Sequence, residues 1–445
     1  MKHLYKERWE KLLTPWRWGT DEPCLMDPER SPFLSDFDRI IFSSSYRRLG
    51  KKTQVHPLTR NDHIHNRLSH SQEVSSVGRS LGIKIGQFLK ERNELSENFS
   101  PYDIGTIVQS AALIHDIGNP PFGHAGEEAI RDWFKDSGND NYLKEILTER
   151  QRSDFRIFDG NAQGFRVINS VEMYRDDGGM RLTFPTIASM VKYPWSAHSA
   201  LGKDKAKFNF YISEESYFDK IFSIQGLKEN HTYIRHPLSY LTEAADDICY
   251  RIIDMEDARE LKIINFDKIK EVCAPIYNNL GLDEDYLNKL DSDRRKSGYL
   301  RAKLISYLIN EVIDAFVINY EKIMNGEISD IKSECKEDVR NYFKNAKSIF
   351  NDIIMMDPTK TALEIGSYSL YKRLLDTFIP TAYKFFINQP LIYKERRALD
   401  LMGVNAPKKD DDLYTSYRRV IDFISGMTDD YATFVSRQFS GTSDN

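Results

Sequence analysis

The stretch ALIHDIGNPPFGHAGEEAI, residues 112–130, joins two helical patterns through a sharp turn. Small and aliphatic residues lead up to His115 and Asp116. Gly118 and a Pro-Pro pair then interrupt the pattern, because proline cannot continue the interior of a helix. A second amphipathic pattern begins at His124. The stretch therefore predicts two helices that meet at a turn bearing several ionisable side chains.

Helical periodicity also dominates the chain on both sides of this stretch. Apolar residues recur every three or four positions along 74–88, 104–111 and 304–315, as expected for helices with one buried face. Strand-like alternation is scarce, and the segment KFNFYIS at 207–213 predicts a short β-hairpin. We expect a mainly all-α fold with a minor β-hairpin.

The composition limits the class of protein. The 445 residues carry a net charge of −5, so the protein as a whole does not attract polyanions, and any phosphate site must be built locally. One candidate is the basic run YRRLGKKTQ at 46–54, for which a solvated surface is the alternative. The apolar runs are far shorter than the ~20 residues of a membrane span, and the N-terminus lacks a signal-peptide core. We therefore expect a cytoplasmic protein with no membrane partner.

Two histidines fall on the buried faces of the predicted helices. His70 lies four residues before Val74 of one apolar stripe, and His115 lies four residues after Ala111 of the next. A lone histidine on such a face is most often a hydrogen-bonded core residue. Asp116 changes this interpretation, because a buried carboxylate beside a buried imidazole is costly unless it is paired or binds a metal.

A third helix supplies a candidate for the remaining ligand. In the segment EAADDICYRIIDMEDA at 243–258, Asp246, Tyr250 and Asp254 share one face. Acids at this density usually mark a solvated face, but a tyrosine among them is more typical of a cleft wall. Asp246 or Asp247 could complete a set of two histidines and two aspartates, and the helical phase favours Asp246.

These motifs together resemble a known family. RLSHS, HDIGNPPFGHAGE and EAADDICY resemble the HD-domain superfamily, and more narrowly the bacterial deoxyguanosinetriphosphate triphosphohydrolases. The resemblance extends to RRLGKKTQV at 47–55, GNAQGFR at 160–166, VKYP at 191–194 and FISGMTDDYA at 423–432. It is weakest between residues 260 and 420.

The resemblance implies a domain organisation. An HD-domain helical core with an N-terminal substrate-binding segment would occupy residues 1–260, and a helical C-terminal region at 261–445 would pack on that core. Members of the family assemble into ring-like homo-oligomers, often hexamers, so a homo-oligomer is expected by analogy.

The resemblance also implies an activity. The family cleaves a deoxynucleoside triphosphate between the 5′ oxygen and the α-phosphorus, which releases the deoxynucleoside and intact tripolyphosphate. A divalent cation on His70, His115, Asp116 and Asp246 would polarise the α-phosphate and activate a water molecule. Mg²⁺ is the expected cellular ion, although two histidines and two aspartates would also accept Mn²⁺, Fe²⁺, Ni²⁺ or Zn²⁺.

Further residues receive roles by resemblance. His124 is implied as the proton-transfer residue, near a helix N-terminus that favours phosphate oxygens, and Glu127 as its partner. Capping of its own helix is the alternative for Glu127, and a solvated position is the alternative for Lys192. The implied substrate contacts are Arg67, Lys192 and Tyr193 for the phosphates, Gln54, Tyr250 and Asp254 for the deoxyribose, and Asn161 for a further contact.

Two other functions compete with this one. An HD-type phosphodiesterase acting on another nucleotide would share the metal ligands but lack the GNPPFGH and GNAQGFR motifs. A non-catalytic helical module that binds single-stranded nucleic acid is the alternative from a different class, and single-stranded DNA therefore stays among the candidate partners.

Overall fold

The structure is a computed structural model that describes residues 2–441 except 28, 59–60, 144–145 and 231. Within these residues the fold is helical, and its sheet consists of β1 (Lys228–Glu229) paired antiparallel with β2 (Thr232–Tyr233). The expected mainly all-α fold with a minor hairpin is confirmed.

The position predicted for the hairpin is wrong. In the segment 207–213, Phe210 forms an isolated bridge with Ser196, and a 3₁₀ turn begins at Ile212. Phe208, Phe210 and the residue between them are all buried, so this segment does not alternate between core and solvent as a surface strand does.

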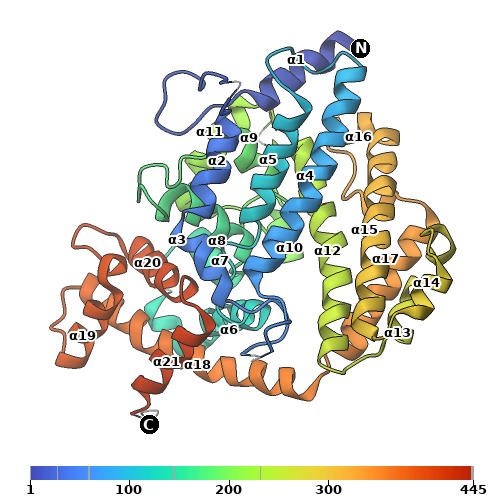
Figure 1. Cartoon of the computed structure of the whole chain (residues 1–445). Coiled ribbons are helices and arrows are strands. Elements are labelled where there is room, and N and C mark those ends of the chain that lie inside the picture. The colour runs from blue at the N-terminus through green and yellow to red at the C-terminus, as the bar shows by residue number, and fades with distance from the viewer. Residues whose placement is uncertain (1, 28, 59–60, 144–145, 231, 442–445) are drawn as a thin grey trace.

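Three long helices form the centre of a first hydrophobic core. α4 (Arg67–Glu91) and α5 (Pro101–Ile114) pack side by side, and α12 (Pro237–Glu260) contacts both (Figure 1). The side chains of Asn66 and Ser100 cap the first turns of α4 and α5, which fixes where these helices begin. The helices that add apolar side chains to this core are α1 (Lys2–Leu13), α2 (Pro32–Ile41), α3 (Ser44–Arg48), α9 (Phe184–Met190), α11 (Glu215–Ile224), α13 (Phe266–Cys273), α14 (Glu284–Lys289), α15 (Asp293–Ile318), α16 (Tyr320–Met324) and α17 (Glu337–Ile349).

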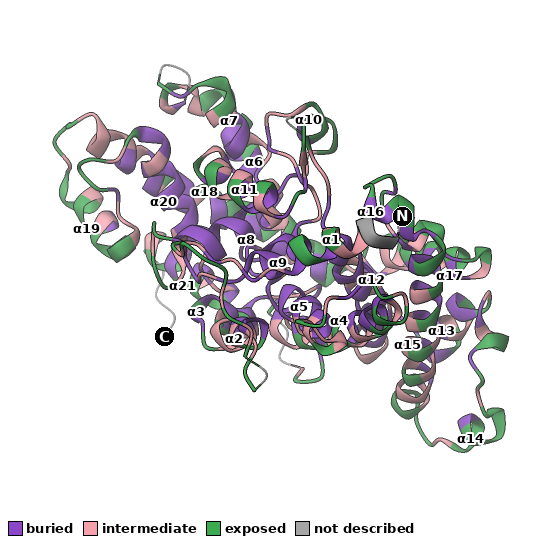
Figure 2. Ribbon diagram, turned by 90° about the horizontal axis from the view of Figure 1, so that it is seen from above, coloured by how far each residue is buried: buried purple, intermediate pink, exposed green. Residues whose placement is uncertain are grey.

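A second hydrophobic core forms around α18 (Pro358–Phe386), which crosses the lower part of the molecule in Figure 1. The helices packed in this core are α6 (Gly123–Lys135), α7 (Glu149–Arg156), α19 (Tyr393–Met402), α20 (Leu413–Ser425) and α21 (Asp429–Phe439). α8 (Gly160–Arg166) contributes Phe165 to the first core and Ala162 to the second. Figure 2 shows α5, α9 and α12 buried in the interior, whereas α10 (Ala200–Lys205), α14 and α19 lie exposed at the periphery.

The two cores do not follow a boundary at residue 260. Apolar residues of 264–354 extend the first core, whereas residues of 122–211 and 370–435 together form the second. The division into 1–260 and 261–445 stays a prediction. Among the described helices, none is both long and apolar enough to cross a membrane.

Candidate active site

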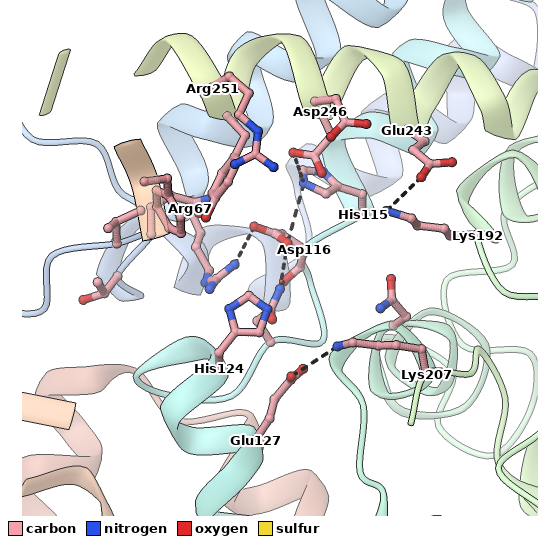
Figure 3. Close-up of a pocket in the computed structure, with 18 of the residues that line it drawn as sticks. Arg67, His115, Asp116, His124, Glu127, Lys192, Lys207, Glu243, Asp246 and Arg251 are labelled. Carbon is pink, nitrogen blue, oxygen red and sulfur yellow. Dashed lines mark hydrogen bonds and ion pairs between the residues drawn. The ribbon is translucent and has the colours of Figure 1, made fainter. Parts of the chain in front are cut away.

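The predicted site residues meet where the two cores join. Helices α4, α5 and α12 present side chains from one side, and α6 and α8 present theirs from the other, around a cavity of about 320 Å³ (Figure 3). The predicted residues that line this cavity are Gln54, Arg67, His115, Asp116, His124, Glu127, Asn161, Lys192, Tyr193, Asp246 and Tyr250. His70 and Asp254 lie outside the lining of the cavity.

His70, His115 and Asp246 form a cluster that suits a metal ion, with three potential ligand atoms within 4.8 Å of one another. His70 Nε2 lies 3.0 Å from Asp246 Oδ1, and His115 Nε2 lies 3.6 Å from the same oxygen. His115 Nδ1 donates a hydrogen bond to the Ala112 carbonyl at 2.6 Å, which directs Nε2 towards Asp246. Two imidazole nitrogens and a carboxylate oxygen are a donor set that fits the expected divalent cation.

Asp116 lies at the edge of this cluster. Its Oδ2 accepts a hydrogen bond from Arg67 at 2.5 Å, and its Oδ1 accepts one from Asn119 at 2.7 Å. The same Oδ1 atom is 3.6 Å from His115 Nε2. The structure therefore gathers three of the four predicted ligands closely and pairs the fourth with Arg67.

The charges of the cluster favour a cation. Burial opposes the negative charge of Asp246, but His115 and His70 outweigh burial and hold the pKa of the Asp246 carboxyl well below its usual value. Burial also disfavours protonated His115, but the carboxylates of Asp116 and Asp246 outweigh it and raise the pKa of His115.

Asp247, the alternative ligand, instead pairs with a lysine of the C-terminal region, Lys332, at 2.7 Å. Geometry therefore favours Asp246 over Asp247.

Close contacts explain two glycines of the turn between α5 and α6. A Cβ on Gly118 would lie 2.0 Å from the backbone nitrogen of Gly164, so glycine lets α8 pack directly against the turn. Gly123 has a φ of 56°, and a Cβ there would lie 2.6 Å from Arg67 Nη2. Because α6 begins at Gly123, His124 lies in its first turn, as expected from the sequence.

Glu127 is a buried carboxylate one turn after His124. Its Oε1 accepts a hydrogen bond at 2.7 Å from the backbone N–H of Gly160, the first residue of α8, so Glu127 caps α8 and not its own helix. Its Oε2 lies 3.6 Å from Lys207 Nζ (Figure 3). Burial opposes ionisation, but Lys207 and then His124 outweigh burial and lower the pKa of Glu127. A negative charge is therefore held close to His124.

The other predicted polar residues surround the same cavity. Lys192 Nζ lies 3.0 Å from Glu243, which outweighs burial and raises the pKa of Lys192, so Lys192 is a paired cation and not a freely solvated one. The Asn161 side chain donates to Asp159 at 2.7 Å. In Figure 3, Arg67 and Lys192 approach the cavity from opposite sides.

Tyr250 and Asp254 follow Asp246 at successive turns of α12. Tyr250 lines the cavity, with its ring 5.1 Å from that of Phe350. Asp254 is 2% exposed, and burial, followed by Asp257, raises the pKa of Asp254 well above its ordinary value. Asp254 does not line the cavity, and the sugar contact expected there stays a prediction.

Several lining residues were missed by sequence reasoning. Lys207 pairs with Glu127 and with Asp159, but a lone lysine in a supposed hairpin gives no signal of this role. The C-terminal region also lines the cavity, with Phe350, Met355, Lys360 and Glu364. The spacing of Lys360 and Glu364, one helical turn, is the one pattern that could have suggested a shared surface.

Comparison with known proteins adds to this geometry. Residues 67–176 match the model of the HD domain, a stretch that ends before Asp246, so the residue that α12 contributes to the cluster lies outside the match. A protein of Pseudomonas aeruginosa (strain PAO1) named "deoxyguanosinetriphosphate triphosphohydrolase-like protein" is 44% identical, over 98% of this chain and 99% of its own length. The chain belongs to the deoxyguanosinetriphosphate triphosphohydrolase family.

More distant members of the family also align with this chain over most of their length. A deoxyguanosinetriphosphate triphosphohydrolase-like protein of Listeria monocytogenes is 33% identical, over 98% of this chain and 100% of its own length. A deoxyguanosinetriphosphate triphosphohydrolase of Yersinia pseudotuberculosis is 30% identical, over 90% of this chain and 92% of its own length. The family likeness thus spans both cores, and the resemblance identified from the motifs is confirmed.

Proposed function

We propose that this chain is a metal-dependent deoxynucleoside triphosphate triphosphohydrolase, which cleaves dGTP or another deoxynucleoside triphosphate to the deoxynucleoside and tripolyphosphate. The proposal rests on one cavity that is lined by His115, Asp246, His124 and several cationic side chains, with His70 completing the cluster beside it. The name of the Yersinia pseudotuberculosis relative supports the same reaction class.

The proposed reaction breaks the bond between the α-phosphorus and the 5′ oxygen. The oxygen of a water molecule joins the phosphorus, and the 5′ oxygen leaves with a proton as part of the deoxynucleoside. A divalent cation held by His70, His115 and Asp246, with Asp116 beside them, would supply Lewis-acid polarisation of the α-phosphate. We assign the proton transfer to His124, and Glu127, one turn further along α6, is its proposed partner.

The cationic side chains are proposed to hold the triphosphate. Arg67 and Lys192 line the cavity beside the metal cluster, and Lys207 lines it beside Glu127. Each of these side chains is paired with a carboxylate of the site, so the positive charge that a polyphosphate requires would come from them together with the proposed divalent cation. Tyr193 and Asn161 are the proposed neutral contacts.

The deoxyribose is proposed to lie along α12, where Tyr250 follows Asp246 by one turn. Tyr250 and Gln54 line the cavity and would contact the sugar. Tyr250 is the proposed steric reason for a preference for deoxyribose, because its ring leaves little room for a 2′ hydroxyl.

The test is to incubate the protein with each of the four deoxynucleoside triphosphates in Mg²⁺ or Mn²⁺ and to separate the phosphate products by ion chromatography. We expect tripolyphosphate and deoxynucleoside in equal amounts. Monophosphate with pyrophosphate, or stepwise release of orthophosphate, would contradict the proposal.

Two results would favour the competing functions. Hydrolysis of a cyclic nucleotide or a guanosine polyphosphate, without turnover of deoxynucleoside triphosphates, would favour the phosphodiesterase. A salt-dependent gel shift with single-stranded DNA, without any hydrolysis, would favour the nucleic-acid-binding module. The identity of the metal, the homo-oligomer and the cytoplasmic location stay predictions.

A further inference from the structure

The FISGMTDDYA motif at 423–432 has no role in the proposed reaction, although it contacts two loops of the site. It spans the end of α20 and the start of α21. Asp429 is the first residue of α21 and is 3% exposed, whereas the next residue, Asp430, is exposed. Two adjacent aspartates therefore differ sharply in their surroundings.

The Asp429 carboxylate binds two backbone amides that are distant in sequence. Its Oδ2 accepts from the N–H of Thr53 at 2.9 Å, and its Oδ1 accepts from the N–H of Phe122 at 3.0 Å. Thr53 directly precedes Gln54, and Phe122 directly precedes α6, which carries His124. One side chain thus joins the two loops that present these residues to the cavity.

The backbone conformation at Phe122 explains why a hydrogen bond at this loop matters. Phe122 has a φ of 61°, in the left-handed region that a residue with a bulky side chain rarely adopts. It occupies the N-cap position of α6 without making a side-chain cap. The bond from its N–H to Asp429 therefore helps to fix the conformation from which α6 departs.

A second contact between the same regions supports this arrangement. Lys52 Nζ donates to the carbonyl of Asn119 at 2.6 Å and to the carbonyl of Ser425 at 2.7 Å. The turn that contains the Pro-Pro pair is thus attached to the α20–α21 corner through Asn119 at one end and through Phe122 at the other.

We propose that Asp429 is a positioning residue that fixes His124 and Gln54 relative to each other across the cavity. This inference rests on the proposed function for its catalytic consequence, but the two hydrogen bonds can be tested without substrate. A carboxylate accepts both amides at once. The isosteric amide in Asp429→Asn offers one acceptor oxygen and therefore keeps at most one of the two bonds.

The first test is hydrogen exchange of the full chain, read by mass spectrometry in Asp429→Asn and in the matched control Asp430→Asn. The two prolines before Phe122 have no amide hydrogen, so a peptide covering 119–124 reports on few amides. We expect faster exchange in this peptide, in the peptide containing Thr53, or in both, for Asp429→Asn alone. Unchanged exchange in both peptides would overturn the proposal.

The second test asks whether Asp429 acts through His124. We expect Asp429→Asn to lower kcat by about 10- to 100-fold, as a displaced catalytic group does, with the metal content unchanged. On a His124→Ala background the same substitution should lower kcat less than about threefold, because the group being positioned is already gone. An equal loss on both backgrounds would show a general structural role and would overturn the proposal.

A control covers poor folding of Asp429→Asn. Asp429→Glu keeps the charge and both acceptor atoms but moves them by one methylene, and it should show the same dependence on His124. If the wild type turns over no deoxynucleoside triphosphate, the proposed function fails, and the exchange experiment still decides whether Asp429 holds the two loops.

Discussion

Lys207→Met is expected to destabilise the protein in a pH-dependent way. Lys207 Nζ lies 3.6 Å from Glu127 Oε2 and 3.4 Å from Asp159 Oδ2, and these two carboxylate side chains are 3% and 0% exposed. Methionine keeps the apolar length of lysine and removes the charge. The variant would therefore fold with two buried acids whose shared cation is missing.

The magnitude follows from the burial of the three groups. Removing one partner of a fully buried ion pair costs about 3–5 kcal/mol. The Lys207 side chain is 29% exposed, and Arg131 remains 3.8 Å from Glu127, so we expect a cost below this range, about 2–3 kcal/mol, at pH 8.

The two buried acids, Glu127 and Asp159, determine how the stability of Lys207→Met depends on pH. In the wild type, burial, together with Glu127, already raises the pKa of Asp159, while Lys207 acts against that rise. Without Lys207 the folded-state pKa of Asp159 rises further above its unfolded value, and the folded-state pKa of Glu127, which Lys207 helps to lower in the wild type, rises as well. The folded variant then binds more protons than the unfolded chain, so its stability falls as pH rises through and above the unfolded pKa of about 4.

The assay is urea unfolding of the wild type, Lys207→Met and the control Lys205→Met, at pH 5, 6.5 and 8 without nucleotide. Lys205 lies over the Trp195 ring, 5.3 Å from its centre. We expect the loss for Lys207→Met to be largest at pH 8 and to shrink towards pH 5. A loss that is the same at all three values, or equal to that of Lys205→Met, would refute this reasoning.

Three further predictions concern the proposed reaction. Asp116→Ala should abolish turnover and weaken metal retention. Metal analysis after gel filtration measures the retention. Wild-type turnover and metal content in this variant would show that Asp116 is not part of the site. His124→Ala should keep the metal but lose roughly 10²–10⁴-fold in kcat, and loss of metal instead would make His124 structural. Tyr250→Ala should narrow the preference for deoxy- over ribonucleoside triphosphates, mainly by slowing deoxynucleotide turnover. Asp254→Asn should lower kcat/KM for deoxynucleoside triphosphates more than for their 3′-deoxy analogues, which have no 3′ hydroxyl to donate. Unchanged kcat/KM ratios among deoxy, ribo and 3′-deoxy substrates would show that this face of α12 does not hold the sugar.

The cluster of His70, His115 and Asp246 could be anticipated in part from local helical spacing. His70 and His115 lie at a fixed offset from an apolar stripe, and burial of that stripe directs the side chains inward. Asp246 lies off the apolar stripe of its helix and was favoured over Asp247 because it shares a face with Tyr250. The turn between α5 and α6 was predictable for a similar reason, since glycine and proline act on the backbone nearby. The pairing of Asp116 with Arg67 was not, because it depends on the spatial approach of α4 to the end of α5.

The opposite side of the cavity depends on long-range packing, which a single sequence does not encode in any local pattern. Lys207 reaches Glu127 from a segment some eighty residues away, and Glu364 joins the cavity from α18 of the C-terminal region. The hairpin was predicted at the wrong position because the aromatic residues Phe208, Phe210 and Tyr211 give this segment a high strand propensity. Tertiary burial decided that segment, not alternation.

The central claim is that water attacks the α-phosphorus of a deoxynucleoside triphosphate, and ¹⁸O-labelled water tests it most directly. A reaction with dGTP and Mg²⁺ or Mn²⁺ in H₂¹⁸O should give tripolyphosphate that carries one atom of the label and deoxyguanosine that carries none, as read by mass spectrometry. Label in the 5′ hydroxyl of the nucleoside, or in a nucleoside monophosphate or pyrophosphate, would contradict the account.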